Sequence, residues 1–173
     1  MRKTDFFWLL AYPFYQTLGT IRHEAAHAFV AWFQGAKIDK FIFLPSIQNG
    51  QFYFGYVDWT SGDVSWLTTA APYLLDLLTF GLFFVLCGFF RFKHHWLWLN
   101  LVILGMISPL INSAYQYFKP GLLGYGDIGW LLRHQSPSWV HAYMIVTIGL
   151  YLVGLWFIFT RSRHIRDRRA DTL

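Results

Sequence analysis

Four long apolar stretches constrain the fold of this chain more than any other feature. They cover about residues 6–33, 66–90, 96–118 and 138–160, and each reaches the ~20 largely apolar residues that a helix needs to cross a bilayer. The composition agrees, because 55% of the residues are hydrophobic and only 13% are charged. We therefore expect an all-α polytopic membrane protein with four transmembrane helices in a single membrane-embedded domain, residues 1–173.

Basic residues near the ends of these stretches predict the orientation. Arg2 and Lys3 precede the first stretch, Arg91 and Lys93 separate the second from the third, and the tail 161–173 contains five arginines. Lys and Arg near helix ends favour the cytoplasmic side, so we expect a multi-pass protein of the cell membrane with both termini in the cytoplasm. Beside a membrane helix, the basic tail indicates contact with anionic lipid rather than with nucleic acid.

The first stretch contains the pattern H-E-x-x-H at His23-Glu24-Ala25-Ala26-His27. Residues four apart lie one above the other on a helix, so His23 and His27 can share one metal ion. Glu24 is rotated by about 100° from His23, which places its carboxylate beside the metal as a general base for a bound water. An interfacial polar cluster without metal is the alternative. We favour the metal, because these polar groups need partners in hydrocarbon.

Residues 36–59 have the aromatic and β-branched content of strands. Asn49-Gly50 separates two such runs, at about residues 41–44 and 51–57, and predicts a β-hairpin between the first and second transmembrane helices. Since its apolar residues have no soluble core to enter, we expect the hairpin to lie against the membrane helices near the mouth of the site. It is either a structural lid or an edge that holds an extended peptide.

Two polar residues interrupt the second and third stretches. Asp76 lies well inside an apolar run, where a carboxylate needs a partner. It is a candidate metal ligand, a proton-relay group, a partner for Arg22, or a protonated carboxyl group hydrogen-bonded across helices. Asn112 follows Pro109 and is a candidate for binding backbone, either that of a substrate or that of its own broken helix.

A glycine-rich segment, residues 121–130, carries one acid, Asp127. The predicted orientation places the loops 34–65 and 119–137 on the same, non-cytoplasmic side, which the C-terminal half of the first stretch also approaches. Asp127 can therefore reach His23 and His27. The alternative is that it caps a helical turn over residues 128–133, since Asp is a favoured cap.

In their order along the chain, these motifs resemble those of the site-2 protease family of intramembrane zinc metallopeptidases. The resemblance covers about residues 18–132. It includes the H-E-x-x-H helix, the β-rich segment 36–59, the Ala70-Ala71-Pro72 motif and the pair Asn112 and Asp127. The pair is farther apart than is usual in that family, and Ile128 replaces a glycine after Asp127. The third ligand therefore stays open between Asp127, which we favour, and Asp76.

The resemblance implies a zinc metalloendopeptidase that cleaves a transmembrane segment of another protein. Zn2+ would be bound by His23, His27 and an aspartate, with Glu24 as the general base and Asn112 holding the substrate strand. Two other functions remain open. One is a non-proteolytic metal-binding membrane protein that binds or regulates a partner helix. The other is a metal-dependent hydrolase of a small or lipid substrate.

Overall fold

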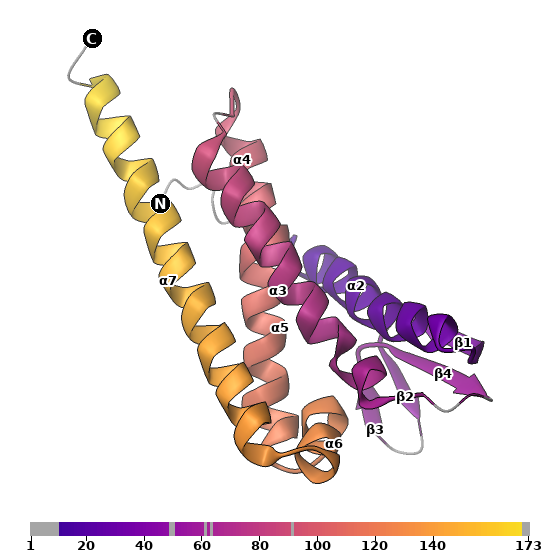
Figure 1. Ribbon diagram of the computed structural model, residues 1–173. Helices are drawn as coiled ribbons and strands as arrows, with labels where there is room; N and C mark the ends of the chain where they lie inside the picture. The colour runs from indigo at the N-terminus through magenta and orange to yellow at the C-terminus, as the bar shows by residue number, and fades with distance from the viewer. Residues whose placement is uncertain (1–10, 49–50, 61, 63, 91, 171–173) are drawn as a thin grey trace.

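The computed structural model describes residues 11–48, 51–60, 62, 64–90 and 92–170 (Figure 1). Several sequence predictions fall outside this range: the start of the first apolar stretch, the Asn49-Gly50 turn, and the basic residues Arg2, Lys3 and Arg91. Within the range the fold is mostly helical, with a small antiparallel β element after the first helix, as the sequence predicts.

The helices follow the apolar stretches closely. In chain order they are α2 (Tyr12–Phe33), α3 (Trp66–Phe89), α4 (His95–Val102), α5 (Ser108–Gln116), α6 (Gly126–His134) and α7 (Pro137–Ala170). Two π-helical segments, η2 (Ile103–Ile107) and η3 (Tyr117–Gly121), continue α4 and α5 into one long helix. Pro109 explains part of this irregularity, because a proline lacks the N–H that an α-helix requires.

Among the described residues, three helices are long and apolar enough to cross a membrane: Trp66–Phe89, His95–Gly121 and Pro137–Arg161. They match the second, third and fourth predicted spans. The described part of the first predicted span, α2, has 22 residues but a lower hydropathy, since it carries the polar residues of the H-E-x-x-H motif. The chain is therefore a multi-pass membrane protein with three candidate spans among the described residues.

Local signals define both ends of α2. Pro13 lies in the first turn, where no backbone N–H is needed. At the other end Gly35 has φ 87°, and the Gly35 and Ala36 N–H groups donate to the carbonyls of Trp32 and Ala31. The helix therefore ends less than two turns after His27, which leaves the motif near the start of the β element.

The predicted hairpin is present as two short antiparallel ladders instead of one. The outer ladder pairs β1 (Lys37–Ile42) with β4 (Tyr56–Thr60), with an irregular register between Ile38 and Lys40. The inner ladder pairs β2 (Ser46–Gln48) with β3 (Gln51–Tyr53). Pro45 lies just before β2 and Gly55 just before β4, and both residue types interrupt strands.

The strands and α6 lie at the same end of the long helices (Figure 1). The connection between α3 and α4 and the C-terminal end of α7 lie at the opposite end (Figure 1). The described parts of the loops 34–65 and 119–137 therefore lie at one end of the long helices, in agreement with the prediction that they share a side. This arrangement brings α6 to the part of α2 that carries the histidines.

Two buried clusters hold the helices together. One joins α3, the α4–η2 segment and α7, and contains Phe80, Cys87, Val102, Met106, Tyr151, Leu155 and Ile158. The other lies near α6 and contains Tyr73, Tyr117, Ile128, Leu131 and Met144. In the second cluster Ile128, which is 1% exposed, follows Asp127 directly. Burial of Ile128 therefore holds the start of α6, and with it Asp127, against the membrane helices.

Candidate metal centre

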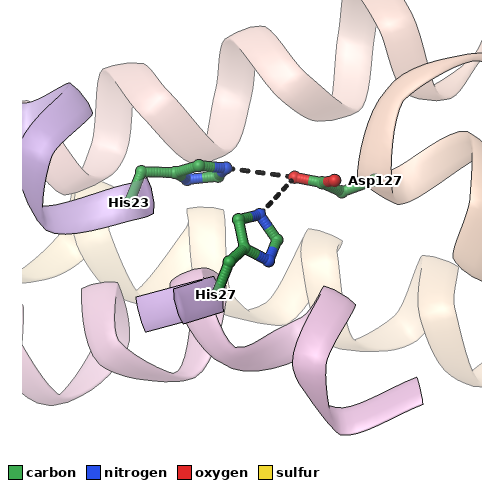
Figure 2. A group of neighbouring side chains, drawn as sticks. All are labelled: His23, His27 and Asp127. Atoms are coloured by element: carbon green, nitrogen blue, oxygen red, sulfur yellow. Dashed lines mark hydrogen bonds and ion pairs between the residues drawn. The ribbon is translucent and has the colours of Figure 1, made fainter. Parts of the chain in front are cut away.

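His23 and His27 present their rings to the same point (Figure 2). They lie one turn apart on α2, both are buried, and their ring centroids are 4.9 Å apart. The Nε2 atom of His23 lies 3.0 Å from Asp127 Oδ2, and that of His27 lies 3.2 Å from the same oxygen. Two imidazoles and one carboxylate, from segments about a hundred residues apart, thus converge on one position.

Asp127 enters this cluster from the first turn of α6. Its side chain points to the histidines rather than capping the helix, and the Tyr73 hydroxyl donates to its Oδ2 at 3.3 Å. Burial acts to raise the pKa of Asp127, but the imidazoles of His27 and His23 outweigh this effect and hold its pKa well below the usual range. The carboxylate is therefore ionised, which is the form that binds metals.

His27 is oriented by the backbone of α3. Its Nδ1 lies 2.8 Å from the Thr68 carbonyl oxygen, which can only accept, so Nδ1 carries the hydrogen. The other ring nitrogen, Nε2, then faces Asp127. Metal-binding histidines usually donate their second ring N–H to a carbonyl or carboxylate in this way.

His23 is oriented by Asn112 on α5. The Asn112 Nδ2 atom lies 3.2 Å from His23 Nδ1, and it also donates to Asp76 Oδ2 at 2.7 Å. Asp76 in turn forms an ion pair with Arg22, at 2.7 Å between Oδ1 and Nη2. Arg22 was one of the partners that the sequence suggested for Asp76. The two aspartates thus have different positions, with Asp127 beside both histidines and Asp76 beside Arg22.

Glu24 lies beside this cluster and is also buried. Its carboxylate interacts with the backbone N–H of Val57 on β4. The chain approaches α2 closely here, because a Cβ added at Gly55 would lie 2.5 Å from Thr20 Cγ2 and 3.1 Å from Glu24 Cγ. The β element therefore packs directly against the proposed general base.

A cavity of about 730 Å³ opens in front of these residues. One wall is helical and carries His23, Glu24, His27, Asn112 and Asp127. The other wall consists of β3, β4 and the turn between them, and it is largely aromatic. The Phe54 ring of this turn meets Tyr115 of α5 edge to face, with centroids 6.2 Å apart. The predicted position of the hairpin near the site is observed.

The residues present fit a metal ion. One ligand atom from each of His23, His27 and Asp127 lies within 4.8 Å of the others, and no other such group of His, Cys, Asp or Glu occurs among the described residues. Two imidazoles with one carboxylate are a donor set of catalytic zinc sites, in which a fourth position stays open. The cluster can therefore hold a metal and leave access from the cavity.

Sequence reasoning missed two groups that support the cluster, the Tyr73 hydroxyl and the Thr68 carbonyl. Tyr73 lies three residues before Asp76, so the two share one side of α3. This spacing could have indicated that Tyr73 faces the same polar interior as Asp76. A backbone carbonyl such as that of Thr68 has no sequence signature, because every residue carries one.

Comparisons with known proteins identify the family of this chain. Searches of curated proteins and of solved structures gave no match. The profile of the Peptidase M50B-like family matches residues 6–172, which is nearly the whole chain. This family consists of site-2 protease-like metallopeptidases, in agreement with the resemblance seen in the motifs. The chain belongs to the Peptidase M50B-like family.

Proposed function

We propose that this protein is an intramembrane zinc metalloprotease that cleaves a peptide bond in or near a transmembrane segment of a substrate protein. The convergence of His23, His27 and Asp127 on one position carries the proposal. The peptidase family supports it. Glu24 adds the remaining catalytic group, because it lines the same cavity as the three ligands.

Each residue of the cluster has a defined role. His23, His27 and Asp127 would hold Zn2+. When bound, the ion supplies a Lewis acid that activates water and polarises a peptide carbonyl. Glu24 accepts a proton from the water and later donates it to the leaving amine.

The cavity walls suggest how a substrate binds. Because a closed helix hides its carbonyls, the substrate segment has to unwind before cleavage. An unwound segment needs partners for its backbone, and the strand wall beside Glu24 offers aromatic side chains and backbone groups. Asn112 lines the same cavity, and its amide oxygen is our candidate for binding the substrate strand. A strand wall of this kind favours a peptide over a small molecule or lipid.

In the membrane, we place α2 as a fourth transmembrane helix beside the three apolar ones, in a single domain over residues 1–173. The basic residues favour cytoplasmic termini. The site then lies toward the non-cytoplasmic side, at the end of the helices where α6 and the strands gather (Figure 1).

Metal content and cleavage test the proposal together. The full chain, purified in detergent, should contain about one zinc ion, measured by elemental analysis. It should also cleave labelled casein, or a single-span membrane protein reconstituted with it in liposomes. A chain that binds no zinc when zinc is supplied contradicts the proposal. Zinc binding without cleavage of either substrate supports a non-proteolytic role in binding a partner helix.

A further inference from the structure

The carbonyl group that orients His27 belongs to an interrupted turn of α3. In a regular α-helix the Thr68 carbonyl would accept from the backbone N–H four residues later, and that position is Pro72. A proline has no N–H, and its ring also clashes with the carbonyl of the residue four positions before it. The Thr68 oxygen therefore lacks its regular donor within α3 and can accept a hydrogen bond from α2.

His27 is the donor that takes this place. Its Nδ1 lies 2.8 Å from the Thr68 oxygen, which is a normal hydrogen-bond length, and both residues are buried. Buried carbonyl groups need hydrogen-bond partners, so the imidazole replaces the missing N–H of Pro72. With the hydrogen on Nδ1, Nε2 is the ring nitrogen that is free to bind a metal, and it faces Asp127.

A glutamine holds this turn of α3 against α2. Gln34 lies seven residues after His27, which is close to two helical turns and therefore on the same side of α2. Its Oε1 accepts from the Ser65 N–H at 2.6 Å and from the Thr68 hydroxyl at 3.4 Å. Its Nε2 donates to Ser65 Oγ at 3.0 Å. Gln34 thus joins the end of α2 to the first turn of α3 and keeps Thr68 beside His27.

We propose that Pro72 is a positioning residue for the metal site, which acts on His27 through the Thr68 carbonyl. Its missing N–H leaves this carbonyl to His27 Nδ1, and the ring is held in the tautomer and orientation in which Nε2 can bind zinc. Gln34 completes the arrangement by fixing Thr68. This inference rests on the proposed function and deepens it, because it explains why a helix tolerates a buried proline that is unfavourable for the helix itself.

Pro72→Ala is the direct test, because the new N–H at position 72 competes with His27 for the Thr68 carbonyl. Zinc affinity is measured on the full chain in detergent by competition with a chromophoric chelator. We expect the Kd for zinc to rise about 10-fold, since loss of an outer partner of a metal ligand weakens metal binding. Phe80→Leu is the control, because it removes buried volume farther along α3 without adding a donor. Its zinc affinity should equal that of the wild type.

A second set of variants acts on Thr68 from α2 and leaves α3 unchanged. Gln34→Leu removes the contacts with Ser65 and Thr68, and we expect the Kd for zinc to rise about 2–10-fold, as for the loss of a hydrogen bond. Gln34→Glu keeps an acceptor for the Ser65 N–H and the Thr68 hydroxyl, so it should bind zinc like the wild type. Gln135→Leu makes the same change at the C-terminal cap of α6 and is the control.

Nuclear magnetic resonance of the zinc-loaded chain, with 15N in its histidine rings, examines the hydrogen bond directly. We expect the His27 ring to carry its hydrogen on Nδ1 and this hydrogen to exchange slowly with water. In Pro72→Ala the exchange should be faster. His134 is the internal reference, because its Nδ1 makes the same kind of bond to the Trp130 carbonyl, at 2.9 Å, in an exposed position. Its hydrogen should exchange rapidly in both proteins.

Two results would overturn the inference: a zinc-loaded wild type with the hydrogen on His27 Nε2, or a zinc Kd of Pro72→Ala within about twofold of the wild type. Wild-type zinc affinity in Gln34→Leu overturns the part assigned to Gln34. A wild-type chain that binds no zinc overturns the proposed function and this inference together. Normal zinc binding by both the wild type and Pro72→Ala removes the role of Pro72 alone and leaves the proposed metalloprotease standing.

Discussion

The two walls of the site cavity differ in how they are built. The helical wall positions its side chains through buried polar contacts, such as Thr68 to His27 and Asn112 to His23. The strand wall is rich in aromatic side chains, and it approaches α2 through a glycine, Gly55. Polar contacts fix geometry and aromatic surfaces bind apolar chains. The helical wall is therefore suited to holding catalytic groups in place, and the strand wall is suited to binding a substrate.

Loss of a ligand on the helical wall should have the largest effect. His27→Ala leaves two of the three proposed ligands, so we expect zinc content to fall from about one per chain to near zero, together with complete loss of cleavage. Elemental analysis and the casein assay measure both. His134→Ala is the control, because this histidine stacks on Trp130 outside the cluster. Retention of zinc by His27→Ala would show that the metal binds elsewhere.

Removal of the general base should stop the chemistry without removing the metal. For Glu24→Gln we expect kcat to fall by a factor on the order of 10²–10⁴, because proton transfer loses its positioned carboxylate. Zinc content should stay at the wild-type level. Asp58→Asn neutralises an exposed acid on β4 and should leave kcat unchanged. A Glu24→Gln variant with near-normal kcat would contradict the assignment of the base.

A change on the strand wall tests how strongly the two walls are coupled. In Gly55→Ala the new Cβ meets Thr20 and the Ile42 carbonyl oxygen at 2.5 Å and 2.8 Å, so the strands or Glu24 must shift. We expect kcat/KM to fall about 10–100-fold with zinc retained, since small misplacements near the reacting atoms are costly. Gly81→Ala is the matched control, because nothing lies within 4 Å of its Cβ position. Unchanged kcat/KM in Gly55→Ala would show that the walls are independent.

The smallest effect is expected from loss of one aromatic contact across the cavity. Phe54→Ala removes the edge-to-face contact with Tyr115, and such pairs contribute about 0.5–1.5 kcal/mol. We expect KM to rise about 2–10-fold with kcat nearly unchanged. Ile47→Ala, at an exposed position on β2, serves as the control. A fall in kcat with constant KM would instead assign Phe54 to the chemical step and weaken the division between the walls.

Local patterns were sufficient for much of the fold and for part of the site. Helical periodicity places His23, Glu24 and His27 on α2, and the apolar stretches predict the three long helices. Gly35 ends α2 with a positive φ, a local role typical of glycine, and the strand-rich composition predicted the β element. In each case the residues that carry the sequence pattern lie within or next to the element that they predict. Interactions between neighbouring residues are therefore sufficient to specify these elements.

Only the tertiary structure decided which aspartate joins the histidines. Asp76 and Asp127 were both candidates, and both lie far from the motif in sequence. The packing of Ile128 brings Asp127 to the His23 and His27 rings, while the close approach of α2 to α3 pairs Asp76 with Arg22. The sequence by itself therefore determined the helices and the paired histidines. Long-range packing decided the third member of the cluster and the supports of both rings, because contacts across a hundred residues leave no local pattern.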